Sequence, residues 1–142
     1  MHCALTDATL DVPRVLAAVA DGANGATAVF VGTVRSSNDG RDVTGIDYSA
    51  YEAMAEREIR SIASEASTTF SQARIAVEHR LGTLAVGEIS IVVAAAHPHR
   101  GPALDAMRFA IEQIKRRVPI WKREHYTDGT RAWVDPGGIE LR

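Results

Sequence analysis

Apolar residues along this chain follow two spacings, one typical of strands and one typical of helices. Nearly continuous or alternating apolar runs, bounded by glycine, proline and polar residues, predict strands. The most apolar of these runs is EISIVVAAAH at residues 88–97. The predicted strands cover residues 2–5, 26–34, 43–51, 74–80, 88–97, 120–126 and 131–135. An Asp128-Gly129 turn is expected between the last two strands.

Three helices are predicted from apolar residues spaced three or four apart and from the residues at the helix ends. They cover residues 12–20, residues 52–70 and a segment that opens at Gly101 or Pro102 and ends before Pro119. The first helix follows Asp11, whose carboxylate is expected to cap free amide groups, and Pro13 suits its first turn. A cluster rich in glycine, at residues 22–25, ends it.

Each of the two longer helices presents one apolar face, which is expected to be buried. On the helix at 52–70 this face consists of Ala55, Ile59, Ile62, Ala66 and Phe70. On the last helix the predicted stripe repeats at spacings of three and four residues and consists of Leu104, Met107, Ile111, Ile114 and Val118.

The order of these elements decides the expected fold class. Several strands follow one another between the two long helices, which favours an α+β fold with a mixed, mainly antiparallel sheet covered by helices over a strictly alternating parallel sheet. Gly32, inside a strand, indicates a bulge or a close backbone approach. The small polar residues 35–42 predict a mobile loop, with Arg35 at the strand end. A length of 142 residues predicts one domain, 1–142.

Composition narrows the functional class. The hydrophobic fraction of 46% and the charged fraction of 24% are those of an ordinary globular protein. The single cysteine, Cys3, excludes an internal disulfide and a multi-cysteine zinc site. The N-terminal residues lack the pattern of a signal peptide, and the longest apolar runs are too short to span a membrane. A cytoplasmic protein without membrane contact is therefore expected.

Positive charge concentrates in one segment, KRRVPIWKRE at residues 115–124. It holds five of the sixteen basic residues and one acid, while the whole chain has a net charge of −2. Lys115 and Lys122 are the only lysines. On a helical wheel Lys115 lies about 70° from the centre of the buried stripe, so partial desolvation and a lowered amine pKa are expected there. The alternative is a solvated basic helix end that interacts with the helix dipole.

A second concentration of chemistry is His97-Pro98-His99-Arg100, between a strand and the helix that follows it. Free amides at a helix N-terminus and an adjacent arginine fork favour an anion site. Alternatively, Arg100 pairs with an acid such as Glu88. His97 and His99 without a third ligand make only a weak metal site. Arg35 could reach the same anion or remain a solvated loop residue, and His79 and Arg80 fit a partly buried strand pair.

Several segments together resemble a known family, the large catalytic subunit of molybdopterin synthase. The matching segments are FVGTVR at 30–35, YEAMA at 51–55, EHRLGTLAVGE at 78–88, HR at 99–100 and K-x₃-PIWKRE at 115–124. They occur in the family's order and spacing over most of the chain. The resemblance implies an α/β-hammerhead-type α+β fold. It also implies a sulfurtransferase that converts cyclic pyranopterin monophosphate into the molybdopterin dithiolene, for which no metal or other cofactor is needed.

The resemblance further implies the partners and the site residues. The sulfur donor would be a small ubiquitin-like carrier subunit with a C-terminal Gly-Gly thiocarboxylate, bound at each end of a central homodimer to form a heterotetramer. Lys115 and Lys122 match the family's catalytic lysines. Arg35, His99 and Arg100 match positions around the substrate phosphate and pterin, and Arg131 is a further expected substrate ligand.

A different class remains open on the residues alone. Segment 115–124 is also compatible with a small nucleic-acid- or anion-binding module, whose affinity for nucleic acid would fall steeply with salt. The mildly acidic total charge argues against a general nucleic-acid binder. For the enzyme, the two lysines and the anion-binding residues must converge, and only the tertiary structure can bring them together.

Overall fold

The computed structural model describes residues 1–134. Its helices are α1 (Val12–Val19), α2 (Glu52–Thr69) and α3 (Arg100–Arg117). Its strands are β1 (His2–Thr6), β2 (Ala26–Thr33), β3 (Ser37–Asn38), β4 (Arg41–Ala50), β5 (Arg74–Arg80), β6 (Gly82–Ala85), β7 (Ile89–His97), β8 (Ile120–Tyr126) and β9 (Arg131–Val134). The expected end of the last strand at Asp135 and the tail expected from Pro136 lie outside the described residues.

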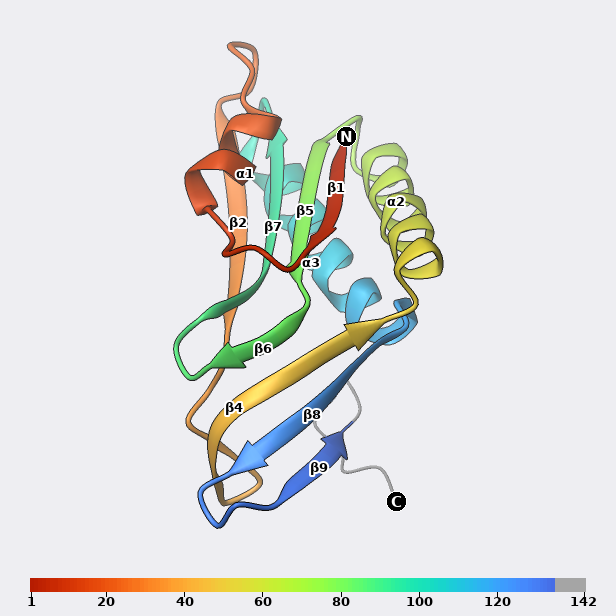
Figure 1. The fold of residues 1–142 in the computed structure, drawn as a ribbon. Coiled ribbons are helices and arrows are strands. Elements are labelled where there is room, and N and C mark those ends of the chain that lie inside the picture. The colour runs from red at the N-terminus through yellow and green to blue at the C-terminus, as the bar shows by residue number, and fades with distance from the viewer. Residues whose placement is uncertain (135–142) are drawn as a thin grey trace.

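The strands form two sheets, which confirms the expected α+β class. The first sheet has the order β1-β5-β7-β2, and the second has the order β3-β4-β8-β9 with β6 also paired to β4. Among the described strands, β1 and β5 form the one parallel pair. Helix α1 covers one face of the first sheet, whereas α2 and α3 cover the other (Figure 1). The second sheet lies beyond one end of the first, and its strands run obliquely to it (Figure 1).

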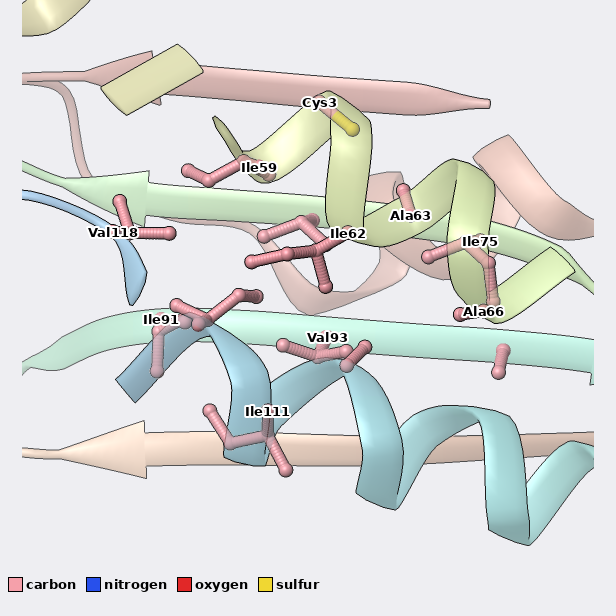
Figure 2. Close-up of a cluster of buried hydrophobic side chains, with 14 of the residues drawn as sticks. Cys3, Ile59, Ile62, Ala63, Ala66, Ile75, Ile91, Val93, Ile111 and Val118 are labelled. Carbon is pink, nitrogen blue, oxygen red and sulfur yellow. The ribbon is translucent and has the colours of Figure 1, made fainter. Parts of the chain in front are cut away.

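Strand β7 owes its continuous apolar run to burial on both faces. Its odd-numbered residues, such as Ile91 and Val93, pack with α2 and α3. Its even-numbered residues, such as Val92 and Ala94, pack with α1. Figure 2 shows the larger cluster, in which side chains of α2 and α3 meet those of β5 and β7. The sheet's central position therefore fixes where both long helices lie.

The predicted stripe of α3 is only partly correct. Ile111, Ile114 and Val118 are buried, and Met107 is partly buried, but Leu104 is 53% exposed. The first half of the helix instead buries a row of small residues, Ala103, Ala106 and Ala110. Alanine lets the helix backbone lie close to the sheet, so the larger Leu104 is left at the side. Residue size, and not apolar character alone, selects the face that packs.

The structure also tests the predictions made for helix ends, turns and strand irregularities. Asp11 precedes α1 as expected, but its side chain makes no capping hydrogen bond, so that prediction is wrong. The segment expected as a loop at 35–42 contains β3 and the start of β4, joined by a turn in which Asp39 and Gly40 have positive φ. The expected irregularity at Gly32 is confirmed, because the β2–β7 register shifts between Gly32 and Thr33.

Ile59 offers a direct test of the core between α2 and the first sheet. Its side chain is fully buried, so Ile59→Ala is expected to lower the free energy of unfolding by about 2–5 kcal/mol through lost burial and the cavity left behind. Urea unfolding at a fixed protein concentration measures this change. Met54→Ala on the same helix is the matched control, since Met54 is 52% exposed and should change stability by about 0.5 kcal/mol or less. Equal effects of both variants would contradict this packing.

Candidate functional site

A cleft of about 330 Å³ lies where the end of β2 meets β4, β8 and the last turn of α3. The ends of elements from both sheets therefore contribute to one concave surface. The polar and charged residues in its lining are Thr33, Arg35, Ser37, Tyr48, Ser90, Lys115, Lys122 and Glu124. Both lysines and Arg35 thus reach the same space, although they belong to three different parts of the chain.

A short turn brings the two lysines together. Helix α3 ends at Arg117, Val118 is buried, and β8 begins at Ile120 directly after Pro119. Successive side chains of a strand point to opposite faces, so Lys122 shares a face of β8 with Ile120 and Glu124. Lys115 sits beside the buried stripe of α3, as its place on the helical wheel predicted. The strand therefore returns past the end of the helix and carries Lys122 into the cleft that Lys115 lines.

The surroundings of Lys115 lower the pKa of its amine. Burial contributes most, followed by the positive charges of Lys122 and Arg35. By surface area the whole residue counts as exposed. The exposed area describes the whole residue, whereas the pKa responds to the protein atoms and cations around the amine, and the surroundings of the amine decide its chemistry. The lowered pKa increases the fraction of neutral, nucleophilic amine.

Glu124 contributes a carboxylate to the cleft that sequence reasoning did not single out. It is 2% exposed, and its Oε1 accepts hydrogen bonds from Asn38 Nδ2 at 2.8 Å and from the Tyr126 hydroxyl at 3.1 Å. Arg35 Nη2 donates to Asn38 Oδ1 at 3.3 Å. Asn38 thus connects the cation to the acid. The available signal was its spacing, since a residue two positions after Lys122 on a strand shares its face.

His79 is the second functional candidate that the sequence did not distinguish. The expected partly buried strand residue is in fact buried, and burial lowers its imidazole pKa to about 4, with a further contribution from the charge of Lys115. Its ring borders a small cavity of about 20 Å³ that Lys115 and Lys122 also line. A buried histidine next to a lysine that borders a cleft was not visible from the alternation of β5 alone.

His99 and Arg100 lie at the other end of α3 from the two lysines. From residue 100 to residue 115, a helix rising 1.5 Å per residue extends about 22 Å. Both residues line a separate pocket of about 560 Å³ together with Gly25 and Pro98. Within one chain, therefore, the structure does not bring them to the cleft that holds Lys115 and Lys122.

Other contacts of this segment bear on the alternatives for it. Glu88 forms its ion pair with Arg80, not with Arg100. His97 Nδ1 accepts a hydrogen bond from the backbone N–H of His99 at 2.9 Å, so that nitrogen stabilises the turn. Over residues 1–134, no three His, Cys, Asp or Glu side chains gather in the way a metal site requires.

Arg131, the remaining predicted substrate ligand, lies away from both pockets. It is an exposed residue of β9, paired in register with His125 of β8. It does not line the cleft around the lysines or the pocket at His99.

In the described part of the chain, none of the helices has the length and apolar character needed to cross a membrane.

Comparison with known proteins identifies the family of this chain. A sequence model of the family described as MoaE protein matches residues 5–117. The molybdopterin synthase catalytic subunit of Nostoc sp. is 42% identical over 138 residues, which cover 96% of this chain and 84% of that protein. The molybdopterin synthase structure from Staphylococcus aureus has a TM-score of 0.89 and 30% identity, and the match covers 93% of this chain and 96% of that one.

A further solved structure contains two different subunits. It is the complex of subunits 1 and 2 of the molybdopterin-converting factor from Helicobacter pylori, with a TM-score of 0.72 and 27% identity over 89% of this chain and 86% of the matched chain. The family model covers most of this sequence, and the similar proteins match this chain over nearly its whole length. On this evidence the chain belongs to the MoaE protein family, that of the molybdopterin synthase catalytic subunits.

Proposed function

We propose that this protein is the catalytic subunit of a molybdopterin synthase and acts as a sulfurtransferase. It would transfer sulfur from the C-terminal thiocarboxylate of a small carrier subunit to cyclic pyranopterin monophosphate, forming the dithiolene of molybdopterin. The observation that carries this proposal is the convergence of Lys115, Lys122 and Arg35 on one cleft. Both the thiocarboxylate and the cyclic phosphate are anions, and a cleft with three cations favours both of them.

The proposed chemistry assigns a role to each cation. The thiocarboxylate sulfur attacks a carbon of the precursor, a carbon–sulfur bond forms, the cyclic phosphate opens, and water then releases the spent carboxylate of the carrier. Lys115 stabilises the charge that develops at the carrier's acyl end, and its increased neutral fraction also lets it accept that acyl group. Lys122 serves the acid–base steps or holds the substrate. Arg35 binds the phosphate.

The proposed oligomeric arrangement is supported by the separation of the predicted substrate ligands. Within one chain, Arg100 lies about 22 Å from Lys115 along the same helix. His99 and Arg100 can therefore serve the same substrate as Lys115 only if a second copy of the chain supplies them. This supports a homodimer in which each copy completes the site of the other. The two-subunit complex from Helicobacter pylori supports a separate small partner, and hence a heterotetramer. The family's biosynthetic role fits a cytoplasmic location.

The alternative of a nucleic-acid-binding module finds no support in how segment 115–124 is arranged. Its cations do not form one surface. Lys115 and Lys122 line the cleft, whereas Arg117 forms ion pairs with Glu58 and Glu65 on α2. Arg123 pairs with Asp47 on β4. A charge concentration in the sequence has thus become several separate interactions, and the similar proteins are molybdopterin synthase subunits.

Replacing Lys115 tests the proposed chemistry. Lys115→Ala is expected to reduce molybdopterin formation from precursor and thiocarboxylated partner by at least about 100-fold, since the group at the acyl end is lost. Lys115→Arg should fail as well, because arginine keeps the charge but not a titratable amine. Arg116→Ala, at the neighbouring exposed position, is the matched control. Wild-type turnover by a folded Lys115→Ala variant would refute the assignment of Lys115.

Because the chain has two lysines, a second experiment can test whether Lys122 and Arg35 lie close to Lys115. Lys122→Gln removes a positive charge near Lys115, so the protonated form becomes more favourable and the Lys115 pKa is expected to rise. Lysine-selective NMR is unambiguous here, because this variant has Lys115 as its only lysine. Arg35→Gln should raise the Lys115 pKa by less. An unchanged pKa in both variants would show that these charges do not face one another.

A further inference from the structure

His79 and Lys115 line the same small cavity, and the proposed chemistry has not used His79. Alternation along β5 places its side chain on the same face as Ile75 and Val77, toward α2 and α3. It is the last of that row and is 4% exposed. There the row passes from the apolar core to a cavity of about 20 Å³ beside Lys115 and Lys122. A cavity of this size has room for about one water molecule.

The hydrogen bond of His79 fixes its tautomer. Nδ1 lies 2.8 Å from the carbonyl oxygen of Arg80, and since a carbonyl can only accept, Nδ1 carries the proton. In the neutral ring Nε2 therefore has the free lone pair. The Tyr48 ring and the imidazole form a T-shaped pair with ring centroids 5.1 Å apart at 75°, which holds the imidazole in place. His79 thus presents a fixed, neutral acceptor instead of a second cation.

The other charged and titratable groups around Lys115 differ from His79 in charge or in position. Lys122 on β8 and Arg35 after β2 are cations and repel the ammonium form. Glu124, on β8, accepts hydrogen bonds from Asn38 and Tyr126. Tyr48, on β4, is a neutral phenol whose pKa is raised chiefly by burial. His79, on β5, is the neutral acceptor on the side of the cavity that faces the core.

We propose that His79 is a positioning residue for Lys115: its Nε2 accepts a hydrogen bond from the Lys115 amine across the small cavity, which has room for one bridging water. This rests on the proposed function, in which Lys115 is catalytic. A carboxylate at this place would hold Lys115 as an ammonium ion through its negative charge, and an apolar residue would leave the amine without a partner on the core side. A neutral imidazole orients the amine and does neither.

Three substitutions of His79 distinguish the roles of its two ring nitrogens. His79→Asn keeps a donor near the Nδ1 position for the Arg80 carbonyl but has no group at the Nε2 position. His79→Gln places an amide oxygen near the Nε2 position, and His79→Phe keeps the contact with Tyr48 but has neither nitrogen. The loss of a hydrogen bond to a charged group predicts that Asn and Phe lower kcat about 10- to 100-fold, whereas Gln stays within about fivefold. The KM for the precursor should change little.

Lysine NMR provides a readout that does not depend on turnover. In His79→Phe the ammonium form of Lys115 loses its acceptor, so the Lys115 pKa is expected to fall, and in His79→Gln it should remain near the wild-type value. Circular dichroism and urea unfolding identify folded variants. His125→Gln is the matched control, since His125 contacts Asp47 and does not line the cleft; it should leave the Lys115 pKa unchanged.

The outcomes distinguish this proposal from the proposed function. If the Lys115 signal and pKa are unchanged in all three variants, His79 does not contact Lys115, whatever the turnover. If Asn and Gln reduce kcat equally, the Nε2 acceptor is not what positions the amine, and the proposal is overturned. If Lys115→Ala is fully active while His79→Phe still shifts the Lys115 pKa, the contact stands and the catalytic assignment of Lys115 falls.

Discussion

The site depends on holding three positive charges together at the junction of two sheets. Lys115, Lys122 and Arg35 repel one another, and partial desolvation adds to the cost of the Lys115 charge. The fold must therefore hold the end of α3 against this repulsion. It does so with Ile111, Ile114 and Val118, which pack in the main core, and with the ion pairs of Arg117 to α2. A site of this kind lowers stability locally, and the core offsets the loss.

The cleft suits an incoming anion because three cations line it. Glu124 is buried in the same cleft, but its Oε1 is engaged by Asn38 and Tyr126. Asn38 also accepts from Arg35, so the turn after β2 is connected to β8 through side chains. His79 supplies a neutral group on the core side. The cleft thus combines a positive potential with a fixed lining, the two requirements for stabilising charge that develops during a reaction.

The same arrangement explains why one basic segment serves two purposes. In KRRVPIWKRE the lysines line the cleft, while Arg117 and Arg123 attach the segment to α2 and to β4. The ion pairs of these two arginines hold the end of α3 against α2 and the start of β8 against β4. Because Pro119 separates the helix from the strand, the two lysines approach the cleft from different elements, and no continuous cationic surface forms.

The sequence by itself determined the features that depend on near neighbours in the chain. The bounds of β5 and β8 and the placement of Lys115 beside a buried stripe follow from the spacing of apolar residues. The irregularity at Gly32 follows from a glycine inside a strand. Where competing apolar residues were available, as with Leu104 against the alanine row of α3, the pattern selected the wrong one, because the packing distance to the sheet decides between them.

The tertiary structure alone decided which chemical groups meet. The pairing of β4 with β8 and the return of the chain after Val118 bring Lys122 to Lys115 and Arg35, and they add Glu124 and His79 to the same surroundings. The length of α3 keeps His99 and Arg100 away from them within one chain. Arg35, His79 and segment 115–124 are far apart in the sequence, and their distances depend on strand pairing and helix packing, which no local spacing encodes.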